Sequence, residues 1–200
     1  SALDREAFQR GTSVYFVDQV VPMLPETISN GCCSLHPGVD RYALSALITL
    51  RENGEIAETE LRESVIHTVV RGVYGEMNDV AALGRESEFY DNYKPVEETF
   101  QRMLELYHVL EERSHQRGAL EMETNEASFR LDADGKPVEI IREELGLCQK
   151  MIEQFMLCAN EGVASWLHWQ HMPCVYRVHD EPNPEKLQAF SVFALNLGLD

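Results

Sequence analysis

The sequence lacks the features typical of membrane and secreted proteins. No apolar run approaches the roughly 18–20 residues that a helix needs to cross a bilayer. The polar start Ser1-Ala2-Leu3-Asp4 does not resemble a secretory signal, and it contains no initiator methionine. We therefore expect a protein without a membrane partner, and a chain cut from a longer protein.

Cysteine is present, but not in the patterns of a zinc site or a disulfide framework. The chain has five cysteines, an odd number, and no two are spaced C-x-x-C. Cys32 and Cys33 are adjacent and can pair only with strain, so we expect both to be reduced, as in cytoplasmic proteins. His168 and His171 lack cysteine or carboxylate partners at ligand spacing. The sequence thus predicts no metal ligand and a cytoplasmic location.

Positive charge is scarce. The formal net charge is −17 at pH 7, whereas a nucleic-acid surface is usually basic. The acidic excess is uneven, because residues 1–50 hold five acidic and three basic side chains while residues 51–150 hold 23 and 12. Solvated outer faces of the middle segments can carry this excess. The charge lowers the expectation of nucleic-acid binding without excluding it.

The periodicity of apolar residues indicates both helices and strands. Residues 95–118 are the clearest helix, with apolar side chains at three- and four-residue steps: Phe100, Met103, Leu104, Tyr107 and Leu110. Residues 41–50 and 55–67 are predicted strands joined by a turn at Glu52-Asn53-Gly54. Other helices are predicted at 3–10, after Tyr74 to cover Val80 to Leu83, at 146–169 and at 184–197. Other strands are predicted at 119–123, 127–131, 137–142 and 174–178.

Two short segments complete this organisation. Asp132-Ala133-Asp134-Gly135 hints at a calcium loop, but the later ligands of that loop are missing and a β-turn is favoured. The stretch from Val20 to Pro25 must be extended, because proline disfavours helix at the residue before it. The sum is a mixed α/β domain, with antiparallel strands packed by long helices.

Four local strings say more than the fold class. The first is a block made of Thr12-Ser13-Val14-Tyr15-Phe16, Pro22-Met23-Leu24-Pro25 and Ser29-Asn30-Gly31-Cys32-Cys33-Ser34-Leu35. The others are Val73-Tyr74, Ile152-Glu153 through Met156 with Ala159-Asn160, and Tyr176-Arg177-Val178-His179-Asp180-Glu181-Pro182. Their order and spacing resemble the RNB catalytic domain of the RNase II/RNase R exoribonuclease family, closest to the RNase R branch.

This resemblance implies part of a 3′→5′ exoribonuclease that hydrolyses single-stranded RNA processively to nucleoside monophosphates. Such enzymes resemble two-metal hydrolases, in which carboxylates hold Mg²⁺ near the scissile phosphate. The family's aspartate cluster precedes, and its arginine motif follows, the region that this chain covers. We therefore expect residues 1–200 to be a partial RNB domain that holds no catalytic or metal-ligating residue and is inactive when isolated. The expected partners are single-stranded RNA and the rest of the nuclease, including possible cold-shock and S1-like domains.

The resemblance assigns RNA contacts to four residues. Tyr15 corresponds to a tyrosine that stacks on the 3′-terminal nucleotide, a contact worth about 1–3 kcal/mol whatever the base. Tyr74 and Glu153 correspond to positions that recognise the ribose, whose 2′-OH both donates and accepts hydrogen bonds. Met122 lies where many relatives have an aromatic clamp residue, and it packs less rigidly.

Structural roles are the alternatives at three of these positions. They are a half-buried strand tyrosine for Tyr15, a core aromatic for Tyr74 and a solvated helix charge for Glu153.

Two other functions also stay open. One is an RNB-like protein that has lost hydrolysis and only binds or regulates RNA. The other is an unrelated α/β domain, in which Tyr15, Tyr74 and Glu153 do not converge.

Overall fold

The computed structural model describes residues 1–120, 126–143 and 145–198. The chain divides into two units, residues 1–166 and 167–200, which are described separately below. In the described part of the chain, no helix is long and apolar enough to cross a membrane.

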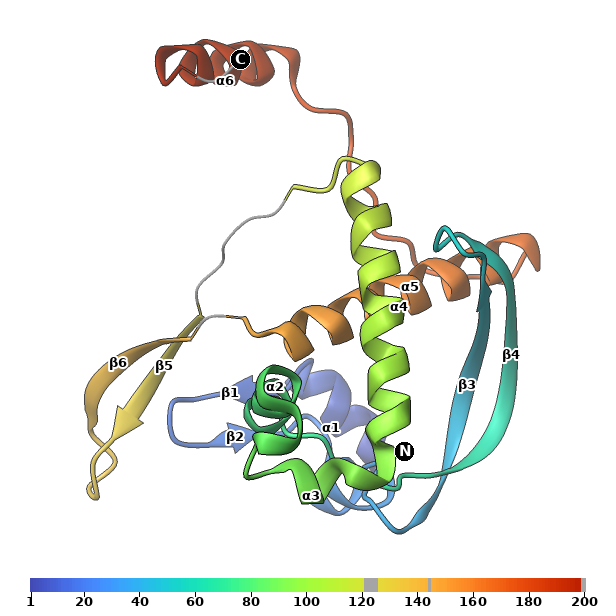
Figure 1. Ribbon diagram of the computed structural model, residues 1–200, viewed down its shortest axis with the longest axis vertical. Coiled ribbons are helices and arrows are strands. Elements are labelled where there is room, and N and C mark those ends of the chain that lie inside the picture. Colours follow the sequence, from blue (N-terminus) through green and yellow to red (C-terminus); the bar gives the residue numbers. More distant parts are fainter. Residues whose placement is uncertain (121–125, 144, 199–200) are drawn as a thin grey trace. The chain divides into compact units, whose positions relative to one another are not determined.

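The first unit mixes helices with three antiparallel strand pairs, as the sequence predicts (Figure 1). Its helices are α1 (Ala2–Arg10), α2 (Tyr74–Leu83), α3 (Tyr90–Tyr93), α4 (Glu97–Gln116) and most of α5 (Leu147–Trp169). Its strands are β1 (Val14–Tyr15), β2 (Val20–Val21), β3 (Asp40–Leu50), β4 (Ile56–His67), β5 (Glu126–Leu131) and β6 (Pro137–Glu143). A π-helical turn covers Thr27–Cys32, and 3-10 turns cover Gly84–Glu86 and Lys94–Val96.

The long β3–β4 hairpin confirms the predicted pair of strands. Its register runs from Asp40 opposite His67 to Leu50 opposite Ile56. The turn closes where the N–H of Gly54 donates to the carbonyl of Arg51, and Gly54 has a φ of 78°, which favours glycine. The hairpin packs on two helices. A Cβ on Gly54 would lie 3.3 Å from Val109 of α4, and one on Gly162 of α5 would lie 2.9 Å from Thr59.

The hydrophobic core lies between α2, α3, α4 and the first half of α5. Its buried apolar side chains are Val80, Tyr93, Phe100, Tyr107, Leu110, Cys148 and Met151. Three of these belong to the periodic set predicted for residues 95–118, and the other two members of that set, Met103 and Leu104, pack against the core from its edge. The three- and four-residue spacing therefore identified the buried face of α4 correctly.

The Asp132 turn is a β-turn, as favoured from the sequence. The Asp132 side chain accepts hydrogen bonds from the N–H groups of Asp134 and Lys136, both at 2.9 Å. Helix α2 begins at Tyr74, so it is longer than the predicted segment ending at Leu83.

Two predicted strands do not stand as predicted. The strand at 174–178 is wrong, because residues 173–183 form neither helix nor strand and Val175 is 99% exposed. Its residues have high β propensity, but a strand also needs a hydrogen-bonded neighbour, and the described residues supply none. In the strand predicted at 119–123, residues 119–120 are not strand, and residues 121–123 lie outside the described residues.

The second unit contains the end of α5, an irregular segment and α6 (Pro184–Asn196). The helix begins after Asn183, whose side chain accepts hydrogen bonds from the N–H groups of Glu185 and Lys186 at 2.9 and 3.2 Å. Pro184 occupies the first turn, where its missing N–H has no cost. The predicted helix at 184–197 is thus confirmed to within one residue.

Candidate functional site

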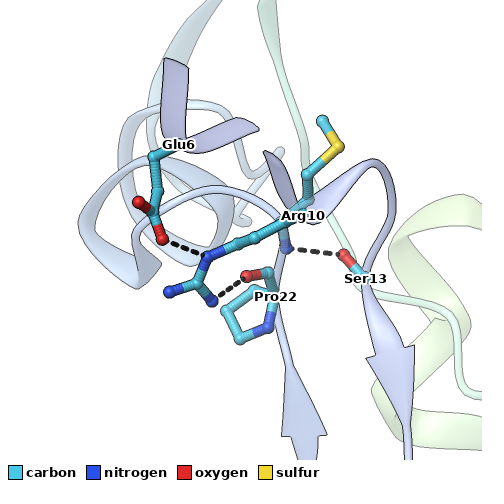
Figure 2. Close-up of polar contacts among 5 residues, drawn as sticks. Glu6, Arg10, Ser13 and Pro22 are labelled. Atoms are coloured by element: carbon cyan, nitrogen blue, oxygen red, sulfur yellow. Dashed lines mark hydrogen bonds and ion pairs between the residues drawn. The ribbon is translucent and has the colours of Figure 1, made fainter. Parts of the chain in front are cut away.

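Tyr15 is presented to solvent on a short hairpin held by α1. The strand residue Tyr15 pairs with Val20, and its side chain is 77% exposed. Figure 2 shows how the hairpin base is fixed. The Ser13 hydroxyl accepts a hydrogen bond from the N–H of Met23 at 3.0 Å, and Nη1 of Arg10 donates to the carbonyl of Pro22 at 3.1 Å. Within this chain Tyr15 is therefore exposed, and its role stays a prediction.

Arg10 is itself oriented by an ion pair within α1. Its Nε donates to Oε1 of Glu6 at 2.7 Å, one helical turn away (Figure 2). This pair is exposed and adds little stability by itself. Its effect is geometric, because it fixes the guanidinium so that the remaining donors reach the carbonyl of Pro22. The N-terminal helix and the Tyr15 hairpin are thereby joined.

Tyr74 is the first residue of α2, and its neighbour Val73 is anchored by a buried tyrosine. The N–H of Val73 donates to the hydroxyl of Tyr93 at 3.2 Å, and that hydroxyl donates to Oε2 of Glu76 at 2.6 Å. Burial, together with the hydrogen bond to Glu76, raises the pKa of Tyr93 above its ordinary value. The side chain of Tyr74 is 47% exposed. Within this chain Tyr74 is therefore not fully buried, and its role stays a prediction.

Glu153 lies exposed on α5, one residue after a helix face that packs into the core. The first turn of this helix is tied to α2 by Asn78. The Asn78 side chain accepts from the N–H of Cys148 at 2.8 Å and donates to Oε1 of Gln149 at 2.9 Å. The N–H groups of a first turn have no acceptor within their own helix, so Asn78 satisfies one of them from outside.

The same contact relates Tyr74 to Glu153. Tyr74 lies four residues before Asn78 on α2, and Glu153 lies four residues after Gln149 on α5. Residues four apart share one face of a helix. Each candidate thus lies one turn from the hydrogen-bonded pair that joins the two helices. Within the described residues, no hydrogen bond or ion pair links the Tyr15 hairpin to this contact.

The fourth candidate, Met122, lies outside the described residues. The described residues contain no group of three or more His, Cys, Asp or Glu side chains that could hold a metal ion. Cys32 and Cys33 are free thiols whose Sγ atoms lie 3.9 Å apart, consistent with the expected reduced state. The described residues therefore contain no Mg²⁺ site.

Sequence reasoning missed Asn78 and Tyr93, which position the candidates without being candidates themselves. Asn78 stands among helix-forming residues and its partners follow 70 and 71 positions later. Tyr93 is one of three aromatic residues within residues 89–93. A polar residue inside a helical apolar pattern was the available signal for Asn78, because such a residue needs a partner when buried.

The comparisons with known proteins identify the family. The model described as "RNB domain" matches residues 1–199, so the chain belongs to the RNB domain family. The chain is 40% identical to ribonuclease R 1 of Lactococcus lactis over 199 residues, and 34% identical to ribonuclease R of Escherichia coli over 198 residues. These alignments cover 100% and 99% of this chain, and 24% of each relative.

The fold agrees with solved ribonuclease R structures. The apo form of Mycoplasma genitalium RNase R matches with a TM-score of 0.90 and 28% identity, covering 100% of this chain and 31% of that one. The same protein in complex with ribose-methylated single-stranded RNA gives the same TM-score. This chain thus spans about a quarter of the length of its curated relatives and has the fold of the matching part of RNase R.

Proposed function

We propose that this chain is the RNA-contacting part of an RNB catalytic domain in a longer 3′→5′ exoribonuclease of the ribonuclease R type. The proposed reaction is processive hydrolysis of single-stranded RNA to nucleoside monophosphates. The match to the RNB domain over residues 1–199 carries the proposal. The RNase R structure that holds single-stranded RNA supports the substrate. Free cysteines at all five positions favour a reducing, cytoplasmic location.

In this proposal Tyr74 and Glu153 form hydrogen bonds with the ribose, and Tyr15 stacks on a base. A phenol and a carboxylate together can accept from and donate to a 2′-hydroxyl. Tyr74 and Glu153 are both exposed, and each lies one helical turn from the Asn78–Gln149 contact. This arrangement supports the proposed role. Tyr15 is exposed on a hairpin whose base is held by two hydrogen bonds, which suits a stacking platform. Met122 completes the proposed set.

Other parts of the longer protein are proposed to complete the domain and its chemistry. Tyr42 and Leu44, which share one face of β3, are exposed by 92% and 73% and form an apolar surface that further protein would cover. We assign the Mg²⁺ ligands to those parts, because the described residues hold no metal-binding cluster. The isolated 200-residue chain should accordingly not degrade oligo(A) in the presence of Mg²⁺. Degradation by the isolated chain would contradict this division of roles.

The test uses the full-length protein with matched ribo- and deoxyribo-oligonucleotides. Glu153→Ala and Tyr74→Ala should lower the ratio of RNA to DNA turnover roughly tenfold, since a hydrogen bond worth about 1.4 kcal/mol gives that factor. Glu105→Ala, at an exposed position on α4, serves as the control and should keep the ratio. An unchanged ratio in both site variants would contradict the assigned ribose contact. RNA binding without any hydrolysis by the full-length protein would favour the binding-only alternative.

A further inference from the structure

A small pocket in the first unit is lined by Arg113, one of whose guanidinium nitrogens is buried. The pocket has a volume of about 60 Å³ and lies between the β3–β4 turn, the last turns of α4 and the middle of α5. Its walls include Arg113 and Ser114 of α4, and Gln154, Cys158 and Glu161 of α5. Nη1 of Arg113 is buried and has no hydrogen-bond partner among the described residues. Leaving a buried guanidinium N–H without a hydrogen-bond acceptor is strongly unfavourable, so we expect a ligand to supply the acceptor.

Two carboxylates, Glu161 and Glu55, lie near Arg113. The nearby Arg117 uses Nη1 to contact both carboxylate oxygens of Glu161, at 2.8 and 3.1 Å. At the turn, Glu55 is 3.3 Å from Arg51 and forms its ion pair there. Each of these carboxylates is thus paired with another arginine. Arg113 interacts with the charge of Glu55 but keeps an unpaired Nη1 donor at the pocket wall.

The size and the remaining donors of the pocket favour one kind of ligand. A single ordered water needs about 10–15 Å³ on this measure of volume, so a pocket of about 60 Å³ is larger than one water requires. The Ser114 hydroxyl and the Gln154 amide add donors beside Arg113. A fork of guanidinium donors matches the geometry of an oxyanion. A nucleotide would be far too large, since drug-sized ligands occupy roughly 300–1,000 Å³.

We propose that this pocket binds a small tetrahedral oxyanion of the inorganic phosphate class, with Arg113 as its main donor and Ser114 and Gln154 as further donors. The ligand would join α4 to α5, and Gln154 is the neighbour of Glu153 in the chain. The proposal rests on this pocket alone and does not depend on the proposed nuclease activity.

Cys158 provides a local probe of occupancy. Burial is the main cause that raises the pKa of this half-buried thiol; Glu161 adds to the rise and Arg113 opposes it. An anion on Arg113 would cover the thiol and cancel the opposing field, so the thiolate would form less readily. In the full-length protein, the rate of alkylation of Cys158 by iodoacetamide is followed by peptide mass spectrometry. Inorganic phosphate is varied at constant ionic strength maintained with sodium chloride.

Phosphate should slow the alkylation of Cys158 several-fold and saturably, while the exposed Cys174 reacts at an unchanged rate. Arg113→Met should abolish this dependence, and Arg102→Met, on the exposed face of the same helix, should keep it. Adenosine monophosphate should give no protection. A wild-type rate that ignores phosphate, equal protection in Arg113→Met, or equal protection by the nucleotide would each overturn the proposal.

Glu161→Gln keeps the proposal testable if Arg113→Met does not fold, which alkylation of the buried Cys148 would reveal. Removing this carboxylate frees Arg117 and takes away a repelling charge. The phosphate concentration that gives half-maximal protection should therefore fall several-fold. An unchanged or higher concentration would contradict an anion site at Arg113.

Discussion

The side-chain oxygen of Asn78 accepts a hydrogen bond from the backbone N–H of Cys148 across 2.8 Å, and so caps α5 from α2. Helix α5 carries Glu153 and α2 begins at Tyr74. The relative position of these two exposed side chains therefore depends on a residue that needs no contact with RNA. A family alignment of ligand-contacting residues alone would not single out Asn78.

Asn78→Leu should loosen the contact between α2 and α5. The change removes the acceptor for Cys148 and the donor to Gln149, leaving a buried N–H unpaired, and we expect a cost of about 1–3 kcal/mol. The free energy of local opening of the α2–α5 contact can be measured from the labelling rate of the Cys148 thiol, because Cys148 is only 2% exposed. Asn78→Asp keeps the acceptor and should cost less. Equal labelling in the leucine variant and the wild type would show that Asn78 does not hold the helices together.

Gly162→Ala should weaken the docking of α5 on the β3–β4 hairpin. A Cβ at this buried position would lie 2.9 Å from Oγ1 of Thr59 and 3.2 Å from Cδ1 of Ile48, so the hairpin must shift. Overpacking of this kind costs about 1–3 kcal/mol, more than the gain in helix propensity. Urea unfolding followed by far-UV circular dichroism gives the change in free energy.

Gly75→Ala is the matched control for this substitution. Gly75 lies in α2 and a Cβ there meets nothing within 4 Å. Alanine should stabilise this helix by roughly 0.5–1 kcal/mol. If both substitutions changed the free energy of unfolding in the same direction, the close approach of α5 to Thr59 would be contradicted.

Tyr93 should make stability depend on alkaline pH. Its pKa is raised in the folded protein by burial and by the hydrogen bond to Glu76, whereas the pKa of an unfolded tyrosine is about 10. The folded state then binds more protons than the unfolded state above that pH. The stabilisation is fully present below the unfolded pKa and is lost as the pH rises through the folded pKa.

Tyr93→Phe tests this dependence. Urea unfolding between pH 8 and 11 should show a shallower alkaline loss of stability in the variant than in the wild type. At pH 8 the variant should be less stable by about 1–2 kcal/mol, because Val73 loses its acceptor and Glu76 loses its donor. Tyr42→Phe, at a position 92% exposed, should change neither quantity. An identical pH slope in wild type and Tyr93→Phe would assign the alkaline loss to other groups.

Local patterns predicted the elements of this fold better than its contacts. The spacing of Phe100, Tyr107 and Leu110 identified the buried face of α4, and the Asn53-Gly54 turn located the β3–β4 hairpin. The strand predicted at 174–178 failed because β propensity does not supply a neighbouring strand. Local sequence also says nothing of which helix meets which, so the Asn78 contact with α5 could not be predicted.

The candidate site was predicted from motifs, and its geometry came from the structure. Tyr15 and Tyr74 are exposed in this chain, as their proposed roles require, and the ribose and stacking roles remain predictions. The buried Nη1 of Arg113 had no signal in the sequence. An arginine on a predicted helix ordinarily faces solvent, and only the packing of the Gly54 turn over α4 encloses this one.

Ser13→Ala should loosen the hairpin that presents Tyr15. The substitution removes the acceptor for the N–H of Met23, next to the carbonyl of Pro22 that Arg10 holds (Figure 2). Amide hydrogen exchange in the full-length protein should be faster at Met23, by roughly fivefold for a hydrogen bond worth about 1 kcal/mol. Thr12→Ala is the control, because within the described residues the hydroxyl of the exposed Thr12 donates only to the carbonyl of the adjacent Ser13. If Tyr15 is the stacking residue, Ser13→Ala should also weaken binding of single-stranded RNA while Thr12→Ala does not. Faster exchange with unchanged RNA affinity would separate the hairpin from RNA binding and count against the role of Tyr15.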